Sequence, residues 1–327
     1  MAQYIRDRMM IGEHHAIHEV QRLARRAARC HLPVLITGET GTGKELLADF
    51  IHRNSFRSEG PFVTVDCGVL TREVARSELF GHLRGAFTGA LETRQGLVKI
   101  AQGGTLFLDE VGELDNELQQ YLSRLVQEGE FRPLGGAKMQ KANVRLVMAT
   151  HRDLDQRVSE GAFRKDLFYR LHVISLHLPP LRHRRSDIPL LVAHFLERFQ
   201  RTGISKREFS DDALRVLEAH DWPGNIRELA HVVAQALVFA EGARIEPKDL
   251  SLSVKPSEDV GEIYGLPYKE ARQESLNRFT REYLHRTLLK TRGNVSQAAR
   301  ESGIGRQYFQ LRMAEQDIRA EPYRRKQ

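Results

Sequence analysis

The chain contains few cysteines and no long apolar run. Its 327 residues include two cysteines, Cys30 and Cys67, which imply no disulfide framework and are typical of a reducing compartment. No segment approaches the roughly 20 apolar residues that a membrane-spanning helix needs, and residues 1–12 carry charge where a signal peptide needs an apolar run. We therefore expect a cytoplasmic protein without a membrane partner.

Acidic residues are outnumbered by basic ones. The chain has 43 Asp and Glu against 50 Lys and Arg, which gives a formal net charge of +7. This balance favours a polyanionic partner, although solvated basic faces produce the same balance in other proteins. With 41% hydrophobic and 28% charged residues, the composition is typical of a soluble globular protein, and the length predicts two or three domains.

Short apolar runs separated by longer segments mark the first half of the chain. The runs at 34–37, 62–65, 105–108 and 144–148 predict strands, and the segments between them are long enough to hold helices. This alternation predicts an α/β fold with a parallel sheet that helices cover on both faces.

Beyond about residue 182 the apolar residues recur at helical spacing only. We therefore expect an α/β subdomain over 1–182 and a small helical subdomain over 183–250. Residues 251–268 are rich in Pro, Gly, Ser and acidic residues and predict a linker. The remainder, 269–327, predicts a long helix followed by two shorter ones.

A glycine-rich loop follows the first predicted strand. Gly38, Gly43 and Lys44 have the spacing Gly-x-x-x-x-Gly-Lys, which offers a triphosphate converging backbone N–H groups, one cation and a helix N-terminus. The alternative is a glycine-rich turn that happens to precede a helix. Glu45 stands where this loop usually has Ser or Thr, so a metal ion must take other ligands. The residues expected to bind ATP are Gly38, Glu39, Thr40, Gly41, Thr42, Gly43, Lys44 and Glu45.

An acidic pair, Asp109 and Glu110, follows the third apolar run. After a phosphate-binding loop, such a pair can divide the work of phosphoryl transfer, because Asp109 can hold Mg²⁺ while Glu110 polarises the attacking water. Without the loop, an Asp-Glu pair after a strand is usually a solvated turn. We therefore expect an ATPase that uses ATP and Mg²⁺.

A hexapeptide at 85–90 lies between these two motifs. It consists of Gly85, Ala86, Phe87, Thr88, Gly89 and Ala90. The glycines let the backbone turn sharply and hold Phe87 and Thr88 outward, where a partner can touch them. The alternative is a hairpin whose Phe packs back into the core.

Four motifs in one order resemble the bacterial enhancer-binding activators of sigma-54 RNA polymerase, which belong to the AAA+ ATPase superfamily. They are the segments 38–45 (GETGTGKE), 77–82 (SELFGH), 85–90 (GAFTGA) and 222–229 (WPGNIREL). The resemblance covers about residues 11–250 and adds a C-terminal Fis-like helix-turn-helix. It implies an AAA+ P-loop NTPase fold with an α-helical lid, in which the hexapeptide contacts sigma-54 and moves with the nucleotide state.

The resemblance also implies roles for single residues. Arg164 and Arg170 match arginines that reach the nucleotide of a neighbouring subunit, so hydrolysis would require a ring; otherwise they are surface ion-pair partners. Arg227 matches an arginine that senses the phosphates from the lid. Thr150 and His151 match the sensor of γ-phosphate loss, where many relatives carry Asn and where His can donate the same hydrogen bond or titrate near neutrality.

Asp66 departs from the family pattern, which usually places here an Asn that pairs with the catalytic Glu. An ionised Asp66 beside Glu110 would repel it, and the two carboxylates would share a proton. The equal alternative is that Asp66 points to Mg²⁺ or to solvent. We also expect a second loop, rich in Gly and Lys, beside the hexapeptide at 131–141.

The C-terminal segment resembles a DNA-binding helix-turn-helix. Residues 294–304 predict a helix and a glycine turn, and the next helix, over 306–313, would enter the major groove. A helical oligomerisation tail is the alternative, because such patterns are permissive. The residues expected to contact DNA are Arg306, Gln307 and Gln310 at base edges and Arg300 and Arg312 at phosphates.

Taken together, the resemblance implies an activator that binds upstream enhancer DNA, forms a hexamer from dimers at rest, and uses ATP hydrolysis to remodel the sigma-54 RNA polymerase holoenzyme for open-complex formation. The family's N-terminal sensory domain needs on the order of 100 residues and does not fit before residue 11. We therefore expect regulation by a separate protein, by expression level, or through a sensory region that this chain lacks.

Two other protein classes share part of this pattern. A general AAA+ remodelling ATPase has no reason to carry the hexapeptide 85–90. A nonenzymatic DNA-binding repressor should have lost Lys44 or Glu110, and both residues are present.

Overall fold

The computed structural model describes residues 10–68, 72–87, 90–200 and 207–252, together with parts of 280–318. It divides into two compact units, Met1–Ser251 and Leu252–Gln327. Within the described ranges, no helix is both long and apolar enough to cross a membrane. The predicted linker lies outside the described residues from position 253 onward.

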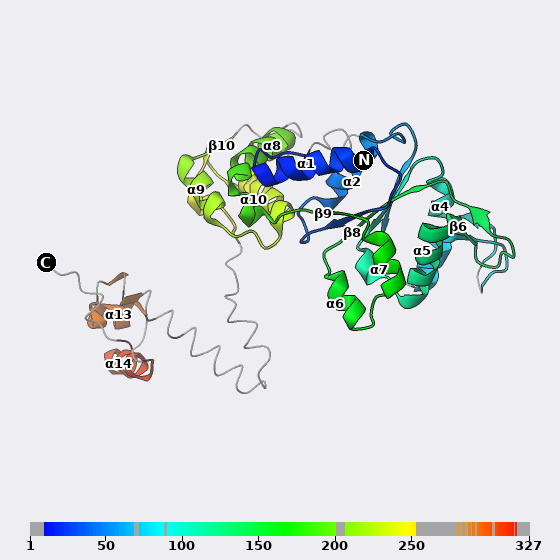
Figure 1. The fold of residues 1–327 in the computed structure, drawn as a ribbon. Coiled ribbons are helices and arrows are strands. Elements are labelled where there is room, and N and C mark those ends of the chain that lie inside the picture. The colour runs from blue at the N-terminus through cyan, green and yellow to red at the C-terminus, as the bar shows by residue number, and fades with distance from the viewer. Residues whose placement is uncertain are drawn as a thin grey trace. The chain divides into compact units, whose positions relative to one another are not determined.

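A five-stranded parallel sheet forms the centre of unit 1 (Figure 1), with the strand order β2-β5-β8-β1-β9. The strands are β1 (Val34–Thr37), β2 (Phe62–Asp66), β5 (Thr105–Asp109), β8 (Arg145–Thr150) and β9 (Ile174–His177). The four strands expected from apolar runs are present, and the predicted α/β class is confirmed. The edge strand β9 was not predicted, because its four residues carry only two apolar side chains, Ile174 and Leu176.

Helices cover both faces of this sheet, as predicted (Figure 1). On one face, α1 (His15–Ala28) and α2 (Lys44–Arg53) share a buried apolar cluster with strand residues such as Ile36 and Phe107. Neighbouring strand residues point to opposite faces, so Leu35 joins the cluster on the other side. That second face carries α3 (Arg72–Phe80), α4 (Leu97–Ile100), α5 (Asn116–Glu128), α6 (Leu154–Ser159) and α7 (Lys165–Leu171). Burial on both sides explains why the strands read as unbroken apolar runs.

Two short hairpins lie at the second face. β3 (Gly81–His82) pairs antiparallel with β4 (Arg94–Gln95), so the hexapeptide 85–90 belongs to the loop between them. β6 (Glu130–Phe131) pairs with β7 (Gln140–Lys141) and encloses the predicted second loop. His82 forms a bridge with Leu134, which places the two loops side by side.

The segment after β9 folds as a small helical subdomain around α8 and α10, which pack against each other. The helical character was predicted, whereas the two-residue strands β10 and β11 are too short to be recognised in the sequence. Its elements are η3 (Leu181–His183), η4 (Arg185–Asp187), α8 (Ile188–Gln200), β10 (Glu208–Phe209), α9 (Asp211–Ala219), α10 (Asn225–Phe239), β11 (Arg244–Ile245) and η5 (Pro247–Asp249). A further short helix, η2 (Val111–Glu113), follows β5.

Unit 2 contains two described helices, α13 (Val295–Glu301) and α14 (Arg306–Glu315). The Asn294 side chain accepts a hydrogen bond from the Gln297 N–H and caps α13 at its start. Two small residues of α13, Ala298 and Ala299, are buried in a cluster with Leu284, Leu288, Phe309 and Met313. These two helices confirm the predicted helix-turn-helix class, while the predicted domain boundaries stay predictions.

Candidate nucleotide-binding site

A cavity of about 500 Å³ lies where the carboxyl edge of the sheet meets the helical subdomain. Ligands of open α/β sheets bind at this edge. The predicted site residues that line it are Thr40, Gly41, Thr42, Gly43, Lys44, Glu45, Asp66, Asp109, Glu110 and Arg227. Of the other predicted residues, Gly38, Glu39 and His151 line a second hollow of about 380 Å³. The sequence therefore placed the loop, the acidic pair and Arg227 at one cavity.

Gly41 lies where the glycine-rich loop touches the helical subdomain. Its φ is +79°, and a Cβ atom built there would lie 2.3 Å from the carbonyl oxygen of Gly224. The Ile226 N–H donates to the carbonyl oxygen of Gly41 at 3.0 Å, which joins the loop to the start of α10. Only glycine fits this conformation and this close approach.

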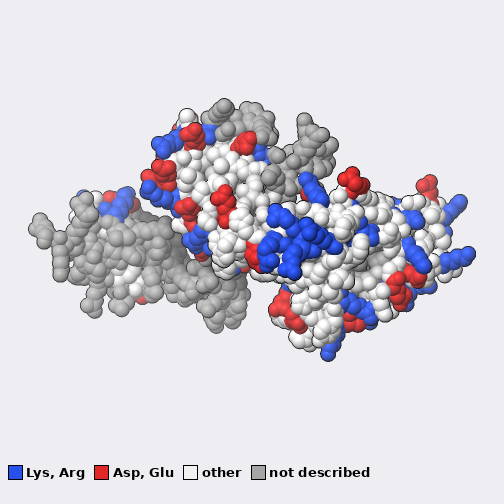
Figure 2. Space-filling model, turned by 45° about the horizontal axis from the view of Figure 1, so that its top comes forward, with Lys and Arg blue, Asp and Glu red and all other residues white. Residues whose placement is uncertain are grey.

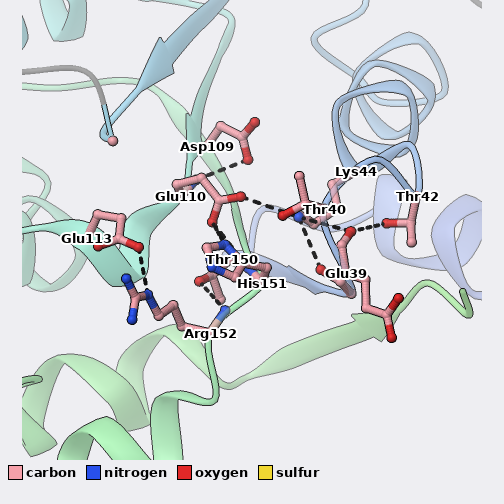
Figure 3. A network of polar contacts seen from close by, with 12 residues as sticks. Glu39, Thr40, Thr42, Lys44, Asp109, Glu110, Glu113, Thr150, His151 and Arg152 are labelled. Carbon is pink, nitrogen blue, oxygen red and sulfur yellow. Dashed lines mark hydrogen bonds and ion pairs between the residues drawn. The ribbon is translucent and has the colours of Figure 1, made fainter. Parts of the chain in front are cut away.

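The Lys44 side chain is buried and folds back over the loop (Figure 3). Its Nζ donates to the carbonyl oxygens of Gly38 and Glu39, at 3.1 and 3.4 Å, and lies 3.4 Å from Oε1 of Glu110. The loop thus holds one ammonium group at the N-terminus of α2, where the helix dipole adds positive potential. This combination suits the oxygens of a phosphate chain.

Glu110 is held from two sides (Figure 3). Its Oε2 accepts hydrogen bonds from the ring Nδ1 of His151 at 2.6 Å and from the His151 backbone N–H at 3.2 Å. Burial alone would raise the pKa of Glu110, but the His151 hydrogen bonds and the Lys44 charge outweigh it and lower that pKa. The backbone of Glu110 has φ of +54°, a strained value for a residue other than glycine that is common at functional sites. Glu110 is therefore an ionised carboxylate at a fixed place in the cavity wall.

Asp109 has the opposite electrostatic surroundings. Burial and the neighbouring charge of Glu110 raise its pKa, against the attraction of Lys44. One carboxylate oxygen accepts the Glu110 N–H at 3.0 Å. A divalent cation would compensate both the burial and the repulsion, and carboxylate oxygens are the ligands that Mg²⁺ prefers. The residues present therefore fit such an ion.

Asp66 stands beside Asp109 in the register of β2 and β5. Its Oδ1 accepts the Gly68 N–H at 2.9 Å, and no hydrogen bond joins it to Glu110 in the described part of the chain. The partner of Glu110 is His151 instead. This arrangement favours the alternative in which Asp66 faces a metal ion or solvent, and its role stays a prediction.

Glu39 bonds to protein groups rather than facing the cavity. Its carboxylate accepts two hydrogen bonds from Arg182, at 2.5 and 2.8 Å, and one from Asn225 Nδ2 at 3.1 Å. The same amide donates to the Thr40 carbonyl oxygen at 3.0 Å, while its Oδ1 accepts the Leu181 N–H at 2.8 Å. Arg182 and Asn225 were not among the predicted site residues, although Asn225 belongs to the motif at 222–229. Together they fasten the loop to the helical subdomain.

Arg184 is a cation in the cavity wall that was not among the predicted site residues. Its side chain is buried, lines the cavity, and donates to the Thr42 carbonyl oxygen at 3.1 Å. Burial lowers the pKa of Arg184 to about 10. The basic run at 182–185 was visible in the sequence, but nothing in it shows which of its side chains turns inward.

Arg164 and Arg170 do not line the cavity of their own chain. Arg164 lies at the start of α7, where its Nε donates to Asp166 at 3.0 Å, and Arg170 lies in the last turn of the same helix. Thr150 is buried at the end of β8, and its hydroxyl accepts the Arg152 N–H at 3.0 Å. None of these three residues lines the 500 Å³ cavity, and their expected roles toward a nucleotide stay predictions.

Comparisons with known proteins identify this architecture. The sigma-54 interaction domain family matches residues 10–177, the AAA+ ATPase lid domain family matches 182–262, and the Fis family of bacterial regulatory proteins matches 275–315. The chain belongs to the sigma-54 interaction family. The predicted resemblance, the AAA+ fold with its lid and the Fis-type helix-turn-helix are confirmed.

Curated relatives of the sigma-54 interaction family share much of this sequence. The regulatory protein AtoC of Escherichia coli (strain K12) is 45% identical over 290 residues, which cover 87% of this chain and 62% of AtoC. The Nif-specific regulatory protein of Rhizobium leguminosarum bv. trifolii is 46% identical over 242 residues, 74% of this chain and 69% of that protein. The chain thus spans less than two thirds of AtoC.

A solved structure supports the same assignment. NtrX from Brucella abortus in complex with ATP is 34% identical, with a TM-score of 0.70 over 97% of this chain and 72% of NtrX. NtrX in complex with ADP gives a TM-score of 0.71 at 33% identity, over 95% of this chain and 70% of NtrX.

Backbone hydrogen bonds join the described residues of the hexapeptide in this sigma-54 interaction domain. The Gly85 N–H donates to the Ala90 carbonyl oxygen at 2.9 Å, and the Ala90 N–H donates to that of Phe87 at 3.0 Å. Phe87 is 45% exposed and meets the His82 ring edge-on at 5.0 Å between centroids, so it does not pack back into the core. Thr88 and Gly89 lie outside the described residues.

In the Fis-type unit, α14 turns its predicted base-reading residues to solvent. Arg306, Gln307 and Gln310 are exposed, while Phe309 on the same helix is fully buried. Arg300 is exposed on α13 with its Nε 3.4 Å from the Ser296 carbonyl oxygen. Arg312 forms an ion pair with Glu315 at 2.7 Å. Their contacts with DNA stay predictions.

Proposed function

We propose that this protein is a sigma-54-dependent transcriptional activator. In this proposal it binds upstream enhancer DNA through unit 2, assembles into a hexamer, and uses ATP hydrolysis to remodel the sigma-54 RNA polymerase holoenzyme. One observation carries the proposal: a single compact unit contains both a cavity lined by an ionised Glu110 and a hexapeptide with an exposed Phe87. Since its partners are DNA and RNA polymerase, we place it in the cytoplasm.

The nucleotide is ATP, in line with the ATP-bound and ADP-bound structures of NtrX. The loop from Gly38 to Glu45 cradles the phosphates with its backbone N–H groups, and Lys44 neutralises their charge. Arg227 and Arg184 line the same cavity from the lid side and add two cations. Asp109, with Asp66 next to it in the sheet, would hold Mg²⁺, and the ion would supply charge neutralisation at the phosphate oxygens.

Hydrolysis uses Glu110 as the group that orients and polarises water. The carboxylate takes a proton from the water while the water oxygen attacks the γ-phosphorus. The bond between the γ-phosphorus and the bridging β-phosphate oxygen breaks, and the products are ADP and phosphate. Arg164 and Arg170 of a neighbouring subunit reach the γ-phosphate and stabilise the charge that spreads over its oxygens. His151 holds Glu110 in place in this step.

The hexapeptide transmits the change in nucleotide state to sigma-54. Phe87 provides apolar contact and Thr88 a hydrogen bond, and both are weak enough for release after hydrolysis. The neighbouring loop at 132–139 lies beside it because of the His82 and Leu134 bridge. A change in nucleotide state would move both loops together.

The test combines the purified protein with sigma-54 and a transition-state mimic of ATP. We expect a complex on native gels that forms only with that nucleotide, that Thr88→Ala abolishes, and that Lys44→Ala abolishes through loss of ATP binding. Thr88→Ala should retain ATPase activity, and Lys44→Ala should retain DNA binding in a gel shift. Absence of the complex with ATPase activity intact would instead identify a general AAA+ remodelling ATPase with another client.

A further inference from the structure

An arginine row covers the outer face of α1. Arg22, Arg25, Arg26 and Arg29 are all exposed. Each residue of an α-helix turns about 100° around the helix axis, so these four positions fall within an arc of about 100° on the helix surface. The row is about 10 Å long, since each residue rises about 1.5 Å. Figure 1 shows α1 along the top of unit 1; Figure 2 turns this side toward the viewer, where a broad group of Lys and Arg side chains gathers near the centre.

Little negative charge accompanies this row. Arg22 forms an ion pair with Glu19, the sole acidic residue of α1, at 2.6 Å. Asp49 on the neighbouring helix is buried and bonded to Arg53. In the part of the chain that the structure describes, Arg25, Arg26 and Arg29 have no carboxylate partner within ion-pair distance. Arg25 lies over the Phe50 ring at 5.3 Å, and the charge of Glu19 acts on Arg26, but neither contact gives these guanidinium groups a carboxylate within ion-pair distance. Arg25, Arg26 and Arg29 can therefore still donate to an anion.

The stability of α1 does not explain the row. The helix is anchored by its opposite face, where Ile17, Val20 and Ala24 are buried. Its last carbonyl groups are already satisfied by buried Arg145, which donates to Ala28 at 2.7 Å and to Ala27 at 2.5 Å. Cations near a helix C-terminus stabilise the helix only slightly when they are exposed. The stability of α1 therefore does not require four exposed arginines.

We propose that the arginine row of α1 is a second DNA contact, which binds the phosphates of a duplex without reading its sequence. A guanidinium group is a planar fork of donors that matches phosphate oxygens. The exposed positions of α1 carry His, Glu and Arg only, so the helix offers neither an aromatic platform for single strands nor an apolar face for a membrane.

Double-stranded DNA is the polyanion that the same chain brings near. Unit 2 belongs to the Fis-type helix-turn-helix family, and a duplex held by one part of a chain is at high effective concentration for the other part. The inference rests on the proposed DNA binding for this choice of partner. Contacts to phosphates would add affinity and strong salt dependence but no specificity.

The experiment measures binding of a random-sequence 40-base-pair duplex to the full-length chain by fluorescence anisotropy at several salt concentrations. The test variant is Arg25→Gln/Arg26→Gln/Arg29→Gln. A matched control, Lys99→Gln/Arg124→Gln/Arg215→Gln, removes the same charge from exposed positions elsewhere. The slope of log K against log salt is negative, and we expect the α1 variant to reduce its magnitude by about 2 to 3, because each lost phosphate contact accounts for about 0.9. Binding at low salt should weaken about tenfold or more, and a triple Lys variant should restore most of it.

A slope that is unchanged, or changed equally by the control, would overturn the proposal. A variant that instead loses binding to vesicles containing phosphatidylserine, or that loses assembly in sedimentation, would assign the row to a membrane or to a subunit contact. A third variant, Arg300→Gln/Arg306→Gln/Arg312→Gln, tests the helix-turn-helix separately. If that variant alone binds normally, the DNA-binding assignment of unit 2 fails while the arginine row stands.

Discussion

At the scale of single residues, the orientation of Glu110 decides what the cavity can do. A buried carboxylate without partners takes up a proton and loses its use as a base. Here His151 supplies two hydrogen bonds to one oxygen, and Lys44 lies 3.4 Å from the other. His151 itself does not line the 500 Å³ cavity. Under the proposed function, His151 therefore acts on catalysis through Glu110.

Replacing His151 should separate catalysis from nucleotide binding. In His151→Ala the ring hydrogen bond to Glu110 is lost, so burial raises the pKa of Glu110 and the carboxylate is less often ionised and less well placed. We expect kcat for ATP to fall about tenfold or more, up to the roughly 10²–10⁴-fold that a general base contributes, while KM changes little. His151→Asn should restore part of kcat. Steady-state ATPase assays check this, with His231→Ala, an exposed position on α10, as the control. A lower affinity with unchanged kcat would contradict it.

The sequence predicted the residue types of the site better than their pairings. Lys44, Asp109 and Glu110 were predicted from loop and strand positions, and the parallel sheet brings their edges together. The bond between Glu110 and His151 depends on the pairing of β5 with β8, which no local pattern contains. Glu39 was expected to contact the nucleotide, but its pairing with Arg182 joins residues 143 positions apart. Such long-range pairings are set by packing between elements.

At the scale of elements, the close approach of the glycine-rich loop to the helical subdomain couples the two. Gly41 and Gly224 meet backbone to backbone, and Asn225 bonds to both Glu39 and Thr40. Direct hydrogen bonds therefore couple the conformation of the lid to that of the loop. The strands of the sheet were predictable because burial on two faces demands apolar runs. The two-residue hairpin strands were not predictable because two residues carry no period, and β9 was not because only two of its four residues are apolar.

Gly41→Ala should uncouple the loop from the lid. Its Cβ would lie 2.3 Å from the Gly224 carbonyl oxygen, and no side-chain rotation can separate them because the backbone fixes the positions of both atoms. We expect ATP affinity to fall at least about tenfold, equivalent to about 1.4 kcal/mol, measured by nucleotide titration. Gly103→Ala is the matched control, since its φ of +78° is similar but no atom lies within 4 Å. That variant should lose only about 1–2 kcal/mol of unfolding free energy from backbone strain. Equal ATP affinity in the two variants would show that the close approach is not required.

At the scale of the whole molecule, two arginines that the sequence assigned to the site lie outside its cavity. The cavity of a single chain contains Lys44, Glu110 and the lid arginines, but Arg164 and Arg170 stand on α7, outside its lining. Under the proposed function these two arginines serve the next subunit. Activity would then belong to contacts between chains, and it would rise with protein concentration as the ring assembles.

Mixing two inactive variants tests this division directly. Glu110→Gln removes the base but leaves Arg170 intact, whereas Arg170→Ala removes the arginine but leaves Glu110 intact. If the arginine acts across the subunit contact, a cavity from the Arg170→Ala chain beside a Glu110→Gln neighbour has every group it needs. In a random one-to-one mixture about a quarter of the contacts in a closed ring have this order, so ATPase activity should reappear at a substantial fraction of the unmodified level. Each variant alone at the same total concentration is the control. Because a purely intramolecular arginine would leave every cavity in the mixture defective, failure to recover activity in rings that still assemble would place Arg170 outside the shared site.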